Sequence, residues 1–238
     1  MSPPELTLAI VAIAISFVVS ASAGLGGSLI LVPALALVLG TKEGAALAAL
    51  LLAGNNVVKL IAYRASIPWR SSIWIVLATV VGAAIGARLL VAAPEDLVTV
   101  AVILSLIGAL VVERLGLETA RRQSAPVLAV GSGLTSGFSG TSGPLKGVAV
   151  RALRFDRLHT VGAASLVSFA GDATKTAIYA DAALIGPEGL LVAAAAAPLM
   201  VAGTLFGRTI NRRIGEHGYA VLFWGVTTAY TWRLISGL

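Results

Sequence analysis

A run of glycine and hydroxyl residues interrupts a long apolar segment in the middle of this chain. The interruption is Ser136–Lys146, with the sequence S-G-F-S-G-T-S-G-P-L-K, and a fainter copy lies earlier at Ala23–Ser28, A-G-L-G-G-S. Lipid offers no partners to backbone amides that leave a helix at membrane depth, so such a break is buried in protein or lines a cavity. We therefore expect each break to join two half-helices, with the two breaks facing each other across one site.

The remainder of the chain is too apolar for a soluble domain of this size. Hydrophobic residues make up 58% of it, charged residues 12%, and the mean hydropathy is +0.95. Apolar runs of about 20 residues recur, each long enough to cross a bilayer. We predict an all-α, polytopic membrane protein. The segment Met1–Glu5 has no basic residue before its apolar run, so no cleaved signal peptide is expected.

Charge and cysteine content narrow the class further. The net charge of +6 is attributed to cytoplasmic loops, where Lys and Arg are retained, and not to nucleic-acid binding. No cysteine is present, which excludes disulfides and thiolate metal sites. We expect no metal and no cofactor.

The two halves of the chain resemble copies of one plan. We predict repeat 1 at residues 1–112, a polar cytoplasmic connector at 113–124 and repeat 2 at 125–238, each repeat being a broken hairpin helix followed by three spans. The predicted spans are 43–63, 72–90 and 97–112 in the first repeat and 158–179, 189–210 and 219–235 in the second. A shift of 116 positions aligns Gly24 with Gly140, Gly27 with Gly143, Lys59 with Lys175 and Tyr63 with Tyr179. After a short insertion, the Gly-x-x-x-Gly pair Gly82 and Gly86 aligns with Gly203 and Gly207, which predicts close helix packing in both copies.

The distribution of basic residues decides how the repeats are oriented. If each broken segment crosses the membrane once, the repeats are parallel and the Lys and Arg residues divide eight against six. If each is a hairpin that returns to its own side, eleven lie on one face and three, Lys42, Arg88 and Arg233, on the other. The second division fits the positive-inside bias. We predict inverted repeats with both termini outside the cytoplasm.

The breaks are the first candidate site. A half-helix would start after each of them, at Ser28 and at Pro144, with Ser28 or Ser142 as the capping residue. Two helix N-termini that face one cavity favour an anion, and discontinuous helices in paired repeats are typical of transporter binding sites. The candidate binding residues are Gly24, Gly26, Gly27, Ser28, Ser139, Gly140, Thr141, Ser142 and Gly143. The alternative is that the glycines only allow helices to pack closely.

Four ionisable side chains inside apolar segments form a second set. Lys146 follows the second break, so its ammonium can reach an anion there or, alternatively, extend to the membrane interface. Asp172 and Lys175 are spaced i, i+3 and either neutralise each other or serve proton coupling or gating. Lys59 and Lys175 are likewise candidates for coupling or gating, and because both lie late in their helices, extension to an interface is again the alternative.

Two asparagines complete the candidates. Asn55 and Asn56 lie in a predicted span and align with Gly171 and Asp172 in the second copy. Their amides can donate to an oxyanion or bind neighbouring helices. The alignment with Asp172 favours the first role.

The chain resembles the sulfite exporter TauE/SafE family of bacterial permeases. The likeness rests on A-G-L-G-G-S-L-I-L-V-P at Ala23–Pro33, G-N-N-V-V-K at Gly54–Lys59 and G-F-S-G-T-S-G-P at Gly137–Pro144. It implies a secondary transporter in the bacterial inner membrane for a small sulfur-containing anion such as sulfite or an organosulfonate. Export is the expected direction of transport. Alternating access around a mid-membrane site is the expected mechanism, with Asp172 as the candidate carrier if a proton is coupled.

Two other functions are compatible with parts of the pattern. A passive anion channel would use the same residues. An intramembrane serine protease is suggested by Gly140–Gly143, which matches G-x-S-G, but it needs a histidine at the same depth, and His159 and His217 both lie in basic stretches. The glycine-rich faces fit a homodimer and an interface between repeats equally well.

Overall fold

Each predicted break separates two helices in the structure. The computed structural model describes residues 3–23, 26–114, 122–141 and 143–213. The first break joins α1 (Pro3–Ala23) to α2 (Gly27–Leu39), and the second joins α6 (Ala125–Ser139) to α7 (Gly143–Arg151). Gly26 and Gly140 both adopt the left-handed conformation, with φ of 92° and 74°. Glycine enters this region without the steric penalty of a Cβ atom, which explains why each turn is built on it.

The described chain is helical throughout, and no strand occurs in those residues. The other α-helices are α3 (Thr41–Ala62), α4 (Trp69–Ala92), α5 (Glu95–Arg114), α8 (Arg157–Asp181), α9 (Pro187–Ala195) and α10 (Ala197–Arg213), and short 3₁₀ turns cover Arg64–Ser66 and Arg122–Ser124. The spans predicted at 72–90, 97–112 and 158–179 each fall within one helix, and the span predicted at 43–63 coincides with α3 except for Tyr63, which follows its last residue. The span predicted at 189–210 was wrong as a single helix, because α9 and α10 meet at a bend of 44°. The span predicted at 219–235 lies outside the described residues.

Length and apolar composition mark two of the described helices as able to cross a membrane. These are α3 and α4, and the bent pair α9 and α10 adds a third if it is counted as one span. Shorter apolar segments lie in α1 and α2. On α4, Val81, Ile85 and Leu89 form an exposed stripe at helical spacing, each about half accessible. Such a continuous apolar face suits contact with lipid.

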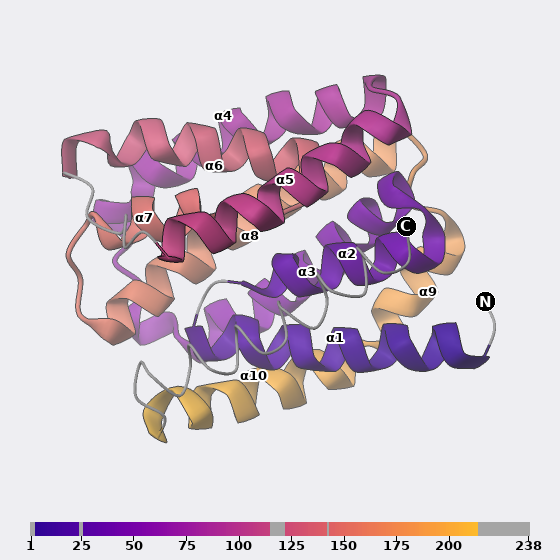
Figure 1. Cartoon of the computed structure of the whole chain (residues 1–238). Coiled ribbons are helices and arrows are strands. Elements are labelled where there is room, and N and C mark those ends of the chain that lie inside the picture. Colours follow the sequence, from indigo (N-terminus) through magenta and orange to yellow (C-terminus); the bar gives the residue numbers. More distant parts are fainter. Residues whose placement is uncertain (1–2, 24–25, 115–121, 142, 214–238) are drawn as a thin grey trace.

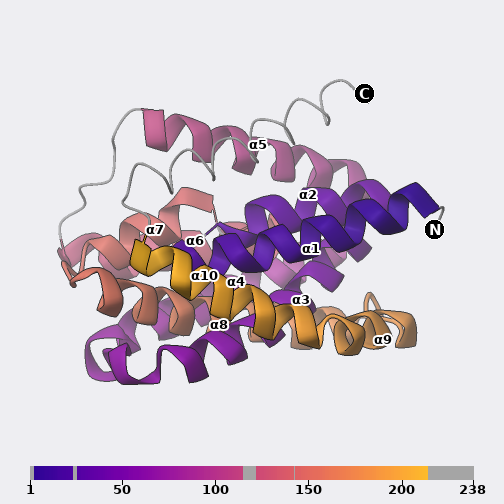
Figure 2. The same cartoon turned by 90° about the horizontal axis from the view of Figure 1, so that it is seen from below.

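Helices of the first half pack against helices of the second half. In Figure 1, α4 of the first half lies along α6 of the second, and α10 of the second half lies along α1 of the first; both are contacts of the structure. Figure 2 shows the α1 and α10 pair from below. Helix α3 contacts α8 between these two pairs.

The predicted close packing of the four glycines is confirmed. A methyl group on Gly82 or Gly86 would overlap backbone atoms of α6, at Val130 and Leu134 respectively. On the other side, a Cβ on Gly207 would lie 2.6 Å from the carbonyl oxygen of Val18 in α1. The backbones therefore approach as closely as small residues permit. This packing fixes α1 and α6, the helices that lead into the two breaks.

Candidate functional site

A cluster of buried charges and amides lies where α3 and α8 meet. Among the acidic side chains whose burial the structure describes, Asp172 is the one that is buried. Its Oδ1 atom lies 2.8 Å from the ammonium of Lys175, and its Oδ2 atom accepts a hydrogen bond of 2.8 Å from Nδ2 of Asn56. Both carboxylate oxygens are therefore engaged, one within α8 and one across to α3.

Lys175 is held by acceptors on two helices. Besides Asp172, its ammonium donates to Oγ of Ser136 at 2.9 Å and to the carbonyl oxygen of Gly140 at 3.2 Å. A lysine has three donors, so these partners use all of them. Lys175 thus connects α8 to the end of α6 and to the second break, and it is 0% exposed, which excludes extension to the interface. The structure shows the contact that mutual neutralisation of Asp172 and Lys175 requires, and a role of the pair in proton coupling or gating stays a prediction.

Lys59 occupies the corresponding position in the first half. Its ammonium donates to Oγ of Ser20 and to Oδ1 of Asn56, each at 3.0 Å. Lys59 is also 0% exposed, so extension to the interface is excluded here too. Ser20 and Ser136 are themselves related by the shift of 116 positions.

Two tyrosines repeat the same relation one turn further along. The hydroxyl of Tyr63 donates to the carbonyl oxygen of Ala21, and that of Tyr179 donates to the carbonyl oxygen of Gly137. Each bond joins the end of the second helix after a break, α3 or α8, to the end of the helix that precedes that break. Both tyrosines are buried.

A small cavity lies beside this cluster, against the first break. Its lining comes from α1, α2, α3, α7 and α8, and consists of Ser20, Gly26, Gly27, Ser28, Leu52, Asn56, Lys146, Ser168 and Asp172. The space open to the centre of a water molecule is about 10 Å³. This is room for about one water molecule. Both halves of the chain contribute to the cavity, and it is closed in this conformation.

Lys146 gives the cavity a positive charge. It lies on α7, is 7% exposed, and donates one hydrogen bond of 2.8 Å to Oγ of Ser168. Among the described residues this is its one hydrogen-bond partner, which leaves two ammonium donors. Extension to the interface is excluded for Lys146 as well.

The hydroxyl and amide groups of the lining also offer donors, whereas the carboxylate of Asp172 is already engaged by Lys175 and Asn56. Ser20 accepts from Lys59 and Ser168 accepts from Lys146, so each hydroxyl retains its own hydrogen for another partner. Asn56 uses its carbonyl oxygen and one amide hydrogen within the cluster, which leaves the second amide hydrogen. Helix α2 begins at the cavity without a side-chain cap, so its N-terminal partial positive charge faces the same space. This arrangement suits an acceptor-rich, negatively charged ligand.

Sequence alone placed the anion between the two breaks, and the structure arranges the second break differently. Ser139 and Thr141 are buried and hydrogen-bond each other, and Ser139 also contacts Ser105 of α5. Neither belongs to the cavity lining. Gly140 supplies its carbonyl oxygen to Lys175, and Gly143 begins α7. Gly24 and Ser142 lie outside the described residues.

Two other expectations are corrected by the geometry. Gly26, and not Ser28, stands at the N-cap position of α2, and it contributes no side-chain cap. Asn55 points away from the cavity lining: its Oδ1 atom accepts from Thr204 of α10, and its Nδ2 atom has no partner among the described residues. Asn56 does line the cavity. Adjacent helical residues face different sides, which explains this division.

Ser20, Ser136 and Ser168 belong to the cluster but were absent from the sequence candidates. Ser20 and Ser136 carried a detectable signal, because they are repeat counterparts at the observed shift. Ser168 aligns with Leu52 and carried none.

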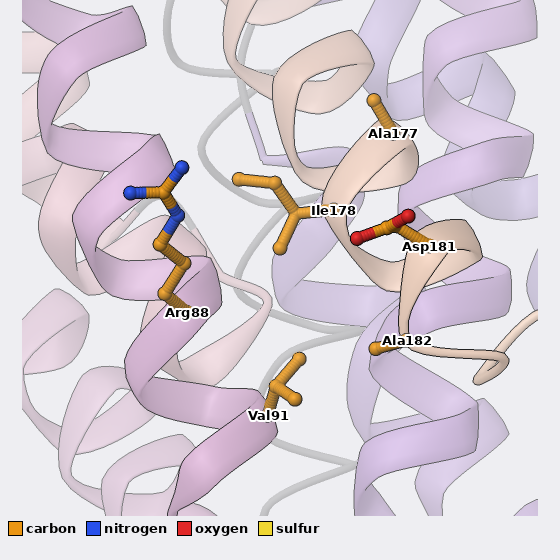
Figure 3. A pocket seen from close by; sticks show the side chains of 6 residues that line it. All are labelled: Arg88, Val91, Ala177, Ile178, Asp181 and Ala182. Atoms are coloured by element: carbon orange, nitrogen blue, oxygen red, sulfur yellow. The ribbon is translucent and has the colours of Figure 1, made fainter.

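A larger open cavity lies at the C-terminal ends of α4 and α8. It measures about 480 Å³ and is lined by Arg88, Val91, Ala177, Ile178, Asp181 and Ala182. Figure 3 shows Arg88 on α4 and Asp181 on α8 on opposite sides of this cavity, with Ile178 between them. Asp181 follows Asp172 by nine residues, about 13 Å along the helix. This cavity is therefore separate from the one at the first break.

The histidine required by a protease is placed at a surface. His159 lies in the first turn of α8, and its side chain is 47% exposed and contacts Asp156. Hydrogen bonds from the backbone N–H and the ring of His159 lower the pKa of Asp156 below its ordinary value of 3.8. Asp156 is the N-cap residue of α8, and it lies outside the apolar segments. Ser142 and His217 lie outside the described residues.

Comparison with known families gives one match. The family described as Sulfite exporter TauE/SafE matches residues 8–234, nearly the whole chain. The comparisons with curated proteins and with solved structures gave no significant match.

Proposed function

This chain belongs to the sulfite exporter TauE/SafE family, whose members are membrane transporters of sulfite and related sulfur anions, and from that premise we propose that it is a carrier with its binding site at the cavity beside the first break. The transported ligand is a small sulfur-containing oxyanion, such as sulfite or an organosulfonate, moved outward. The apolar helices agree with an integral membrane protein.

One observation carries this proposal. The cavity is lined by donors from both halves of the chain, with Lys146 as its positively charged group; the carboxylate of Asp172, which also lines it, is engaged by Asn56 and Lys175. Four kinds of donor converge there: ammonium, hydroxyl, side-chain amide and a helix N-terminus. An oxyanion offers acceptors in several directions at once, whereas a neutral or cationic solute would leave these buried donors unpaired, which is costly.

The closed cavity supports a carrier more than an anion channel. It has room for about one water molecule, so an oxyanion enters only after the surrounding helices separate. The lining combines α1, α2 and α3 with α7 and α8, so movement of one half relative to the other would open it. Inverted repeats, with both termini outside the cytoplasm of a bacterial inner membrane, are part of this proposal.

Proton coupling, if present, is assigned to Asp172. It contacts both halves, through Asn56 and through Lys175, so protonation would weaken both contacts together. The pH dependence of transport should be lost in Asp172→Asn, measured together with Lys175→Gln so that no unpaired ammonium remains. Transport that keeps its full pH dependence in the double variant would exclude Asp172 as the carrier.

The test is ligand binding followed by transport. Purified protein is titrated with sulfite, thiosulfate, sulfoacetate, sulfate and chloride, and thermal stabilisation is recorded for the wild type, Lys146→Ala and the control Lys42→Ala. Lys42 is a cation that donates to the carbonyl oxygen of Val91, away from the cavity. We expect stabilisation by a sulfur oxyanion that Lys146→Ala abolishes and Lys42→Ala retains.

Proteoliposomes then separate a carrier from a channel. A carrier shows saturable uptake and exchange of internal for external labelled ligand, whereas a channel shows neither. Absence of stabilisation by every sulfur anion, or full stabilisation of Lys146→Ala, would overturn the assignment of the site.

A further inference from the structure

The cavity beside the first break has one apolar side chain among the described residues of its lining. That side chain is Leu52 of α3, and the other described lining residues are glycine or polar. Leu52 is 3% exposed. Its Cδ2 methyl lies beside Gly27, the first residue of α2, because a Cβ atom on that glycine would be 3.2 Å from it. A leucine methyl group therefore lies next to the helix N-terminus that faces the cavity.

The two halves of the chain place different side chains at this position of the cavity. Leu52 and Asn56 are four residues apart on α3 and share one face of that helix. Ser168 and Asp172 have the same spacing on α8. A shift of 116 positions relates the first pair to the second, and both pairs line the cavity. The second half thus contributes a hydroxyl where the first half contributes the methyl groups of Leu52.

Hydrogen-bond donors for a ligand come from other parts of the lining. Lys146 donates to Oγ of Ser168, so its ammonium lies beside the hydroxyl of the second half. Asp172 offers a ligand oxygen no donor, because both of its carboxylate oxygens already have partners within the protein and its charge repels an anion. Leu52 offers no donor either. The cavity therefore has a donor-rich part and a part that cannot bind oxygen.

We propose that Leu52 makes the site selective for oxyanions that have one side without oxygen. Sulfite and sulfonates carry three oxygens on sulfur, with a lone pair or a carbon atom in the fourth position. That position lies against the methyl groups of Leu52 while the three oxygens meet the donors. Sulfate and phosphate have oxygen on every side, so one oxygen is buried against Leu52 without a donor, which is unfavourable. The inference rests on the proposed function and narrows its substrate class.

The test compares sulfite, methanesulfonate and sulfate at one pH and one ionic strength. Protein in nanodiscs is titrated with each anion by calorimetry. We expect sulfate to bind about 10- to 100-fold more weakly than sulfite, which is the order of discrimination that an apolar contact achieves against one additional polar group.

Substitutions of Leu52 separate its apolar character from its bulk. Leu52→Asn supplies an amide donor in a side chain of similar shape, so sulfate should bind more tightly and methanesulfonate more weakly than to the wild type. Leu52→Ser introduces the residue of the second half and should act in the same direction. Leu52→Met stays apolar, so sulfite should remain preferred over sulfate whatever the absolute affinities.

Two controls show that the site is folded and that it is the one being measured. The unfolding temperature of each variant without ligand verifies its fold, and changes of opposite sign for two ligands are not produced by partial unfolding. Lys146→Ala removes the charged donor of the same cavity, so it should weaken the binding of all three anions.

The outcomes identify which inference fails. A ratio of sulfate to methanesulfonate affinity that is the same in the wild type, Leu52→Asn and Leu52→Ser would overturn the role of Leu52 and leave the anion site intact. Sulfate that binds the wild type as tightly as sulfite would likewise overturn it. Failure of every anion to bind, or full binding by Lys146→Ala, would overturn the proposed function itself.

Discussion

Asn56 donates its side-chain amide to Oδ2 of Asp172, and the two residues are 116 positions apart in the sequence. The same interval relates Lys59 to Lys175 and Tyr63 to Tyr179. Residues 56 and 172, which the repeat pattern of the sequence aligns, thus contact each other directly. The Asn56–Asp172 contact therefore marks a central seam between α3 and α8, and the binding cavity lies immediately next to it.

The Asp172–Lys175 pair should stabilise the fold only as a pair. Asp172→Asn leaves the ammonium of Lys175 without its counter-charge, and Lys175→Gln leaves the carboxylate, so each single variant should lose about 3–5 kcal/mol of stability. The double variant should be less destabilised than the sum of the singles by about 1–3 kcal/mol. Thermal unfolding in detergent measures this cycle, and additive losses would show that the two side chains act independently.

Loss of either buried tyrosine hydroxyl should lower the stability of the fold by a similar amount. Tyr63→Phe and Tyr179→Phe each remove the bond to a backbone carbonyl before a break, at Ala21 and at Gly137. An unsatisfied buried acceptor costs about 1–3 kcal/mol, so both variants should unfold several degrees below the wild type and by similar amounts. A loss confined to one variant would contradict the equivalence of the two contacts.

Capping of α8 by Asp156 should make stability depend on pH at the acidic end. Because the folded pKa of this carboxyl lies below its ordinary value of 3.8, its contribution is present above that value and is lost as the pH falls through the lowered pKa. Asp156→Ala should therefore unfold at a lower temperature at pH 7, and the gap to the wild type should narrow below about pH 4.

A matched control for the cap is Asp156→Ser. Serine caps a helix without titrating. The Asp156→Ser variant should therefore unfold at a higher temperature than Asp156→Ala at pH 7, and the gap between these two variants should not narrow in the acidic range. Unfolding temperatures across the pH range measure all three proteins. A constant gap between the wild type and Asp156→Ala would contradict the charge dependence of the cap.

Sequence patterns predicted the helices and the breaks well, because both depend on local chemistry. Apolar runs fix helix positions, and Gly26 and Gly140 occupy backbone conformations that other residues avoid. The bend between α9 and α10 was missed, since the apolar pattern continues through it without interruption. The family resemblance of the motifs was confirmed by the match over residues 8–234.

The site was predicted less completely, because its geometry depends on long-range contacts. The sequence identified Lys146, Asn56 and Asp172, which meet around the cavity. It could not show that Ser139 and Thr141 bond each other instead of the cavity, since a hydroxyl in a break looks the same in either role. Nor could it choose between burial and interfacial extension for Lys59, which required the position of Ser20 on α1.

The packing of α1, from the first half of the chain, against α10, from the second half, also constrains how the protein is made. During synthesis α1 leaves the ribosome well before α10, because the glycines that accept it, Gly203 and Gly207, follow almost two hundred residues later. At ordinary translation speeds of about 5–20 residues per second, that interval is on the order of 10–40 s. The first helix must wait in the bilayer for its partner, so assembly of this protein is completed only when the second half of the chain arrives.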